Sequence, residues 1–463
     1  MSLIKPIPAP QLPYELLDGI VRALPTITSQ KPCTLVSRAW AAAAYPRVFR
    51  CIKLSEFVLM EDPPKRGRYC VKRLLDSLLA SSSFLPLCVK ELYLDTFDSD
   101  GFTFNHFQQV LSRFPGLDVI GYDVRHFVLS PPSPSGRDEQ EQPRLSLPIA
   151  TGRRFSKIHI SIGEYGTASA FSQFIGLFDP DCIEELSIGH LELEEDRCPY
   201  SRTNERKARP KAVVKQTSGG LTNESMRILH SVLDIEAVQS IYDETDGGQF
   251  VSFLSNKWHP ANVQHLFGWF SAKYPHEEFT PDKFRLSKFP NLRTLSLAME
   301  VHVSSRRGLS AWEPFGTFVD ILNIAPPTLH DVNVELAMVN TFEAPVEQHR
   351  TRPLSVHSSV TLLQDMGTLG WGALEKAMQR LSRSGCRPTV RIRAVMRDDP
   401  VGPEQHRRTQ CSVQTLGIVP VPRTDTERHA NKIMRDTVIP HLIRDSQVRE
   451  NISFEVVLDP TVE

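Results

Sequence analysis

Residues 11–54 contain two helical patterns, QLPYELLDGIVRALP at 11–25 and CTLVSRAWAAAAYPRVFRCIKL at 33–54. In the first, large apolar residues recur at three- and four-residue steps from Leu16 to Leu24, which predicts one apolar stripe along a helix. The spacing recurs at Val36, Ala39, Trp40 and Ala43, and Pro46 is expected to end that second helix. A segment of this size buries too little surface to be stable alone, so the rest of the chain or another protein must cover its stripe.

These residues also form a recognisable motif. The pattern Leu12-Pro13-x-Glu15-Leu16-Leu17-x-x-Ile20, followed by Leu35-Val36-Ser37-Arg38-x-Trp40, resembles an F-box, most closely the F-box-like proteins abundant in mushroom-forming fungi. The polar interval 25–32 (PTITSQKP) departs from it, because many F-boxes begin an apolar helix there. The alternative is a helical hairpin that packs on its own domain.

The resemblance implies partners and a set of contact residues. F-boxes dock onto a Skp-type adaptor and so join a cullin–RING ubiquitin ligase. The residues implied to face or support the adaptor are Leu12, Pro13, Leu16, Leu17, Ile20, Val36 and Trp40. Some of them must pack internally, and the pattern leaves open which.

The composition is that of an ordinary soluble protein, with 463 residues, 40% of them hydrophobic and 23% charged. This length allows two or three domains or one extended array. The formal net charge of −1 gives no general attraction to nucleic acid or membrane, so neither is expected as a partner. No apolar run reaches the roughly 20 residues that span a bilayer, and the N-terminus lacks a signal-peptide core. The eight cysteines lack paired spacing, which favours reduced thiols in the cytoplasm and/or nucleus.

A short apolar motif recurs downstream, with apolar residues at its first, fourth and sixth positions. Its copies are Val89, Leu92 and Leu94; Ile183, Leu186 and Ile188; Leu292, Leu295 and Leu297; and, more weakly, Leu329, Val332 and Val334. The motif resembles the strand half of a leucine-rich repeat, in which these positions point into a shared core. Further strands are predicted at 117–122 and 155–160, because the intervals between copies are long and uneven.

Helical patterns at 102–114, 171–178 and 315–324 are each followed by proline-marked turns, so the unit is helix, turn and strand. This order favours parallel strands with the helices outside. The predicted fold class is α/β, a small N-terminal helical F-box followed by an irregular leucine-rich-repeat-like solenoid. The alternative is an unrelated α/β domain whose strands happen to match the motif.

The predicted domains follow from this pattern. They are a helical domain at 11–54, a repeat domain at 69–395 with insertions near 130–148 and 199–220, and a C-terminal loop and capping segment at 396–463. The C-terminal elements predicted are a helix at 371–381 ended by Gly385, strands at 389–395 and 452–458, and a helix at 427–443 kinked at Pro440.

Motifs for enzymatic chemistry are missing from the sequence. It has no phosphate-binding glycine loop, no HExxH and no GxSxG, so no catalytic residue, metal site or cofactor is expected. The run at 202–215 holds six basic residues and one acid, and it is interpreted as a solvated loop, with an import or nucleic-acid patch as the alternative.

A partner surface is predicted where residues flank the inward positions of the motif. Its residues are Glu91, Tyr93, Asp95, Glu185, Ser187, Thr294, Ser296, Asp331, Asn333 and Glu335, with Gly189 and Ala298 in the same row. Five of them are acids and none is a base, which favours a basic partner segment, although Arg391 and Arg393 would interrupt the row at its end. The favoured function is therefore a non-enzymatic substrate receptor of an SCF-type (Skp–cullin–F-box) ubiquitin ligase. A repeat scaffold capped by the N-terminal helices is the alternative, and an enzyme with an unrecognised site comes third.

Overall fold

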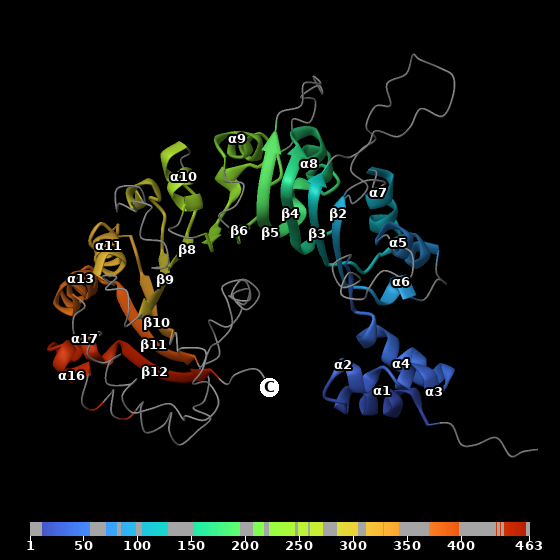
Figure 1. Cartoon of the computed structure of the whole chain (residues 1–463), viewed down its shortest axis with the longest axis horizontal. Coiled ribbons are helices and arrows are strands. Elements are labelled where there is room, and N and C mark those ends of the chain that lie inside the picture. The colour runs from blue at the N-terminus through green and yellow to red at the C-terminus, as the bar shows by residue number, and fades with distance from the viewer. Residues whose placement is uncertain are drawn as a thin grey trace, which may run out of the picture. The chain divides into compact units, whose positions relative to one another are not determined.

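The computed structural model describes residues 12–55, 71–80, 85–98, 104–127, 152–194, 207–216, 222–245, 249–257, 260–271, 285–303, 312–326, 328–341, 370–397, 432, 436 and 439–459. The chain divides into two compact units, unit 1 (Met1–Pro210 with Gly219–Leu233) and unit 2 (Lys211–Ser218 with Asp234–Glu463). Both contain parallel strands and helices, so the predicted α/β class is confirmed (Figure 1). Within the described ranges, every helix is too short or too polar to cross a membrane.

The N-terminal helices of unit 1 are α1 (Tyr14–Ala23), α2 (Ile27–Gln30), α3 (Cys33–Val36) and α4 (Arg38–Val48). Their small core consists of Leu17, Val21, Cys33, Ala43 and Ala44, with Leu24, Trp40 and Val48 packed against it. The single stripe predicted for α1 is wrong, because only every fourth residue of it faces α4. Leu17 and Val21 are buried, whereas Leu16 and Ile20 lie on the solvent side.

Two local features of these helices differ from the sequence prediction. Pro46 does not end α4, which runs on to Val48. Because Pro46 lies in the last turn, its missing N–H removes only one helical hydrogen bond. The polar interval contains a helix of its own, α2, started by a reciprocal cap in which the Ser29 N–H donates to Thr26 Oγ1 (3.1 Å) and the Thr26 N–H donates to Ser29 Oγ (3.2 Å).

The strands of unit 1 are β1 (Cys51–Ser55), β2 (Glu91–Asp98), β3 (Val119–Phe127), β4 (Phe155–Thr167) and β5 (Ile183–Glu194). Each pairs in parallel with the next along the chain. The helices are α5 (Val71–Ala80), α6 (Leu85–Cys88), α7 (Phe104–Arg113), α8 (Ala168–Ile175) and α9 (Asn223–Val232), with a 3₁₀ turn, η2 (Pro180–Cys182). Figure 1 shows α7, α8 and α9 on one side of these strands. The opposite side, called the uncovered face, carries no helix among the described residues of the unit.

An aromatic core holds α7 and α8 on the sheet of unit 1. Phe107 of α7 lies edge-on to Tyr122 of β3 and to Phe174 of α8, with ring centroids 5.1 and 5.2 Å apart. All three are buried, as are Phe127 and Phe155. Edge-to-face rings of this kind each add about 0.5–1.5 kcal/mol to the free energy gained by burial.

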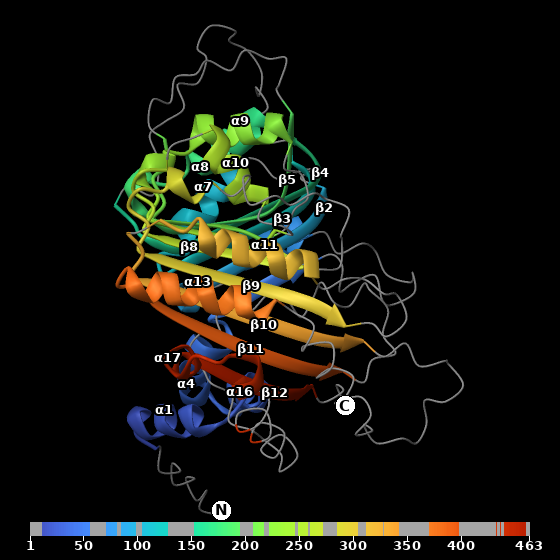
Figure 2. The same cartoon turned by 90° about the vertical axis from the view of Figure 1, so that its left-hand side faces the viewer.

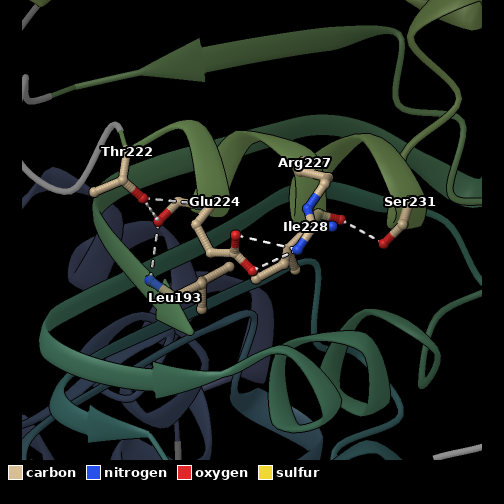
Figure 3. A network of polar contacts seen from close by, with 7 residues as sticks. Leu193, Thr222, Glu224, Arg227, Ile228 and Ser231 are labelled. Carbon is tan, nitrogen blue, oxygen red and sulfur yellow. Dashed lines mark hydrogen bonds and ion pairs between the residues drawn. The ribbon is translucent and has the colours of Figure 1, made fainter. Parts of the chain in front are cut away.

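Hydrogen bonds attach α9 to the end of β5 (Figure 3). The Leu193 N–H donates to Ser225 Oγ (3.0 Å), and the Ser225 N–H in turn donates to Thr222 Oγ1 (3.0 Å), which caps the helix. Glu224 and Arg227 pair one turn apart on the exposed side at 2.9 Å. The sequence analysis predicted no helix at α9.

The strands of unit 2 are β6 (Ala212–Lys215), β7 (Ser240–Asp243), β8 (His265–Ser271), β9 (Thr294–Val303), β10 (Asp331–Thr341), β11 (Arg387–Arg397) and β12 (Ile452–Asp459), again parallel and paired in chain order. The helices are α10 (Gln249–Lys257), α11 (Trp312–Asn323), α13 (Trp371–Arg383), α16 (Ile439–Leu442) and α17 (Ser446–Glu450), and the 3₁₀ turns are η3 (Ile235–Ala237) and η6 (Leu286–Lys288). Figure 2 shows α11 and α13 lying across β9, β10 and β11. The other side carries no helix among the residues of unit 2 that the structure describes, and it is called the uncovered face of unit 2.

The same backbone junction recurs just before successive strands. The Gln264 and His265 N–H groups both donate to the Gln239 carbonyl, and the Arg293 and Thr294 N–H groups both donate to the Gln264 carbonyl. Lys90 and Glu91 repeat this in unit 1 with the Arg50 carbonyl, and His330 and Asp331 repeat it with the Arg293 carbonyl. Each strand is therefore fixed to its predecessor by an equivalent contact, as expected when repeats contact their neighbours.

Several sequence predictions have a clear outcome. The four motif copies and the two added segments all lie at strands, and the predicted helices coincide with α7, α8, α11 and α13. Gly385 follows the end of α13 with φ +87°, a conformation that glycine adopts without strain. The solvated loop at 202–215 and the insertion near 199–220 are wrong at their C-terminal part, because β6 begins at Ala212 and Lys215 is buried. Residues 130–148 and 398–431 lie outside the described residues, as does most of the predicted helix at 427–443.

Candidate protein-binding surfaces

The predicted adaptor residues fall into two groups. Leu12, Leu16, Ile20 and Val36 are exposed by 49%, 55%, 42% and 64%, and Pro13 is also exposed. Leu17 is 2% exposed and Trp40 is half-buried against the same small core, so these two support the helices from inside. Further exposed apolar residues are Tyr14 on α1, Ile27 on α2 and Leu35 on α3. The N-terminal apolar face is defined as Leu12, Tyr14, Leu16, Ile20, Ile27, Leu35 and Val36.

Asp18 forms ion pairs within α1 and between α1 and α4. Asp18 pairs with Arg22 at 2.8 Å within α1 and with Arg47 of α4 at 3.5 Å. Pairs this exposed contribute at most about 1 kcal/mol each, so burial of Leu17 and Val21 dominates the packing. The exposed apolar side chains of α1 make no contribution of that kind until another surface covers them.

The uncovered face of unit 1 carries bases as well as the predicted acids. In register, Lys157 of β4 lies beside Glu185 of β5, and the two pair at 2.8 Å. Glu91 pairs with Arg50 at 3.7 Å. The row seemed free of bases because β1 and β4 were absent from it. Glu91 and Glu185 therefore have basic neighbours, whereas Asp95 lies beside a second acid, Asp123, in register.

Other predicted partner residues of unit 1 are held by their neighbours. Lys53 lies over the ring of Tyr93 at 5.2 Å, and that ring occupies the space above Gly121, where any side chain would collide with it. Asp95 accepts a hydrogen bond from Ser55 Oγ at 2.6 Å. Ser187 is fully buried beside His159, so it cannot contact a partner directly, and its place in the predicted surface is wrong.

The uncovered face of unit 2 shows the same alternation of charge. Parallel register places Arg387, Thr389 and Arg391 beside Asp331, Asn333 and Glu335, respectively. Thr389 Oγ1 donates to Asn333 Oδ1 at 2.6 Å, and Asn333 Nδ2 donates to Ser296 Oγ at 3.4 Å. The polar residues Thr294 and Ser296 on β9 are partly exposed as predicted. The face is therefore polar and of mixed charge.

A depression of about 440 Å³ lies at the start of β8, β9, β10 and β11. It is lined by His265, Arg293, Thr294, His330, Asp331, Gly385 and Arg387. Sequence reasoning missed its bases, although Arg293 and His330 occupy the second position of two recognised motif copies. That position had no role in the pattern, yet its carbonyl accepts backbone N–H groups from the start of the next strand: two at Arg293 and one at His330.

Buried charges in unit 2 have a structural role. Lys215 and Asp243 are register neighbours on β6 and β7, and both are fully buried. Burial lowers the pKa of Lys215 to about 7 and raises the pKa of Asp243 to about 6, and each charge opposes the shift of the other. The Asp243 carboxylate accepts the N–H groups of Thr245 (3.0 Å) and Val251 (2.8 Å), so it fixes the start of α10 on β7.

The described residues therefore define an α/β protein of parallel strands with an exposed apolar N-terminal face and polar uncovered faces. Within these residues, no cluster of three or more His, Cys, Asp or Glu side chains is arranged to hold a metal ion. No model of a known protein family matches the chain, and no curated protein is similar to it in sequence.

Proposed function

We propose that the protein is the substrate-recognition subunit of an SCF-type ubiquitin ligase. In this proposal residues 11–54 are an F-box that binds a Skp-type adaptor and, through it, a cullin–RING ligase. The strands and helices that follow form an irregular leucine-rich-repeat-like solenoid, which holds the target protein. The chain itself is not an enzyme, because the ligase supplies the chemistry, and it acts in the cytoplasm and/or nucleus.

One observation carries the proposal: the N-terminal apolar face. Large apolar side chains that stay in water each forgo about 1.5–3 kcal/mol of burial free energy, and clusters of them commonly mark binding sites. Leu12, Leu16 and Ile20 are spaced by four residues, so the last two lie one above the other on α1. These are motif positions of the F-box resemblance, and their neighbours Leu17 and Val21 already provide the internal core.

The strand arrangement supports the repeat part of the proposal. All the strand pairs described in each unit are parallel and join consecutive strands, and the motif residues Leu92, Leu186 and Leu295 are buried at equivalent positions. A stack of this kind offers its uncovered faces to a target protein. Of the predicted partner residues, Asn333 is exposed, and Glu91, Glu185 and Asp331 are partly exposed.

Co-purification with a Skp-type adaptor tests the proposal. We expect the full chain to retain the adaptor and a Leu16→Asp, Ile20→Asp variant to lose it, because both side chains are exposed and their replacement leaves the core intact. The matched control is Tyr165→Asp, which changes an exposed apolar residue of β4 outside the N-terminal helices. Leu17 is unsuitable as a test position, since its loss would damage the core itself.

Two results would contradict the proposal. A folded wild-type chain that fails to retain the adaptor would assign the helices to a scaffold. Retention by the Leu16→Asp, Ile20→Asp variant at the wild-type level would show that binding does not use the N-terminal apolar face.

A further inference from the structure

The residues at which the strands of unit 2 begin are strongly basic between β8 and β11. This strand-start edge is defined as residues 260–265, 285–294, 328–331 and 380–387. Figure 2 shows β9, β10 and β11 beginning at the same side of the sheet. The edge carries one acid, Asp331, and six arginine or lysine residues: Arg285, Lys288, Arg293, Arg380, Arg383 and Arg387. Its formal charge is therefore +5, in a chain whose net charge is −1.

The bases of this edge are accessible to a ligand. Five of the six are exposed, and Lys288 is partly exposed. Within the part of the chain that the structure describes, none of the six makes an ion pair, although Arg380 donates one hydrogen bond to the Leu322 carbonyl. Bases elsewhere are engaged, as Lys157 is by Glu185 at 2.8 Å. The edge therefore presents positive charge that the sheet itself does not neutralise.

The sheet register places bases of successive repeats next to one another. Arg293 and Arg387 line the same depression, together with His265 and His330. Neighbouring strands lie about 4.8 Å apart, so the edge from β8 to β11 spans about 15 Å. Phosphates along one strand of a double helix are spaced by about 3.4 Å of helix axis, so about four of them face a surface of this length.

The chemistry of the edge distinguishes between anionic partners. A protein partner takes most of its binding energy from a few large anchors that enter pockets, whereas nucleic-acid interfaces are polar and positively charged. Among the described residues of unit 2, the one exposed large apolar side chain is Ile324, which lies outside the edge. Single-stranded nucleic acid also needs accessible aromatic rings on which its bases stack, and the one aromatic ring of Phe, Tyr or Trp in the edge, Phe289, is buried.

We infer that the strand-start edge of unit 2 binds the phosphate backbone of a double-stranded nucleic acid without reading its sequence. Contacts from arginine and lysine to phosphate fix a protein on the duplex but carry no sequence information. The net charge of the whole chain predicted no such partner, because acids elsewhere offset these bases. The edge ends at β7, where Asp234 and Glu236 precede the strand. The inference goes beyond the proposed function and depends on unit 2 alone.

Fluorescence anisotropy of a labelled DNA duplex of about 20 base pairs, titrated with the full chain, tests the inference. We expect saturable binding that weakens as salt rises, because each phosphate contact releases counterions. An Arg293→Ala, Arg387→Ala variant should bind at least about tenfold more weakly, with the slope of log K against log salt reduced in magnitude by about two. Lysine at both positions should keep most of the affinity, since a backbone contact depends mainly on charge.

The matched control is Arg125→Ala, Arg227→Ala, which removes two exposed positive charges from unit 1. We expect this variant to bind the duplex as the wild type does, since neither arginine belongs to the strand-start edge. An RNA duplex of equal length, titrated in parallel, identifies which kind of double helix binds more tightly.

Five results would overturn the inference. The wild-type chain binds neither duplex, or the variant without Arg293 and Arg387 binds as the wild type does after its fold has been checked by circular dichroism. The control loses as much affinity, which would show dependence on net charge alone. Poly-glutamate of equal charge binds as tightly as the duplexes, which would assign the edge to an acidic protein segment. A single strand of the same length binds more tightly than either duplex, which would indicate base stacking.

Discussion

Removing one member of the buried pair Lys215 and Asp243 should give stability losses with opposite dependence on pH. Lys215→Met leaves a buried carboxylate without its counter-charge, and Asp243→Asn leaves a buried ammonium without one. Breaking a buried pair in this way costs about 3–5 kcal/mol. We expect unit 2 to lose stability by an amount of that order in each variant, at the pH where the remaining group is charged.

The direction for Lys215→Met follows from the raised pKa of Asp243. The folded pKa, about 6, lies above the ordinary value of 3.8, so this group's contribution to stability is fully present below about pH 3.8 and is lost as pH rises to the folded pKa. Loss of the lysine charge raises that pKa further. The window of loss then extends above pH 6, and the variant falls further below wild type as pH rises, by at most about 1.4 kcal/mol per pH unit.

For Asp243→Asn the direction is reversed. The folded pKa of Lys215, about 7, lies below its ordinary value of 10.5, so its contribution is fully present above about pH 10.5 and is lost as pH falls to the folded pKa. Loss of the aspartate charge lowers that pKa further. The window of loss then extends below pH 7, and this variant falls further below wild type as pH falls.

Urea unfolding followed by far-UV circular dichroism, at about pH 5.5 and about pH 8.5, measures both differences. The double variant Lys215→Met, Asp243→Asn is the control, because replacing both charges of a buried pair is often nearly neutral, and it should lack the pH dependence. Single variants whose losses are equal at both pH values would refute the reasoning. They would show that the two side chains stabilise unit 2 by packing alone.

The remaining predictions concern stability in unit 1 and the end of α13. Leu17→Ala should destabilise the N-terminal helices by about 2–5 kcal/mol, whereas Leu16→Ala and Ile20→Ala should each change their stability by less than about 0.5 kcal/mol, as measured by urea unfolding. Arg153→Ala should lower the free energy of unfolding by about 1–3 kcal/mol in the same assay. Arg153 donates to the backbone carbonyls of Leu111 and Leu117, between α7 and β3, and lies 5.0 Å over the ring of Phe155. Gly385→Ala should lower the thermal midpoint, since a side chain at φ +87° costs about 1–2 kcal/mol.

The sequence predicted strands at the recognised copies of the motif and missed β6, β7 and β8, where the sixth position is not apolar. It also missed β1, where Ile52 and Leu54 are apolar, because residues 51–54 were assigned to the helical domain. In β6, β7 and β8 the sixth position holds Lys215, Asp243 and Gly268, which form one register row with the buried Leu297 of β9. The first two satisfy each other's charge, so a pattern based on apolar side chains cannot detect them. The first and fourth positions, such as Val263 and Leu266, were apolar and buried as elsewhere.

The division of α1 into a buried and an exposed side could not be read from α1 itself. Leu16 and Leu17 are adjacent leucines, and each fits a three- or four-residue spacing with later apolar residues. The choice is made by α4, whose Ala43 and Ala44 leave space that Leu17 and Val21 fill. Once those two are inside, the helical period turns Leu16 and Ile20 outward. Which F-box-like positions are free for a partner is therefore a property of the helix pair.

Under the proposed function, the distribution of charge indicates where specificity for a target would lie. Some charged residues in the middle of the uncovered faces are matched across neighbouring strands, as with Lys157 and Glu185, and such pairs add little long-range attraction. Arg293 and Arg387, which make no ion pair among the described residues, lie where strands begin, outside the buried positions of the motif. A stack of this kind can keep its core constant while its strand-start residues change. Target choice would then depend on those edge positions more than on the acid row that the motif suggested.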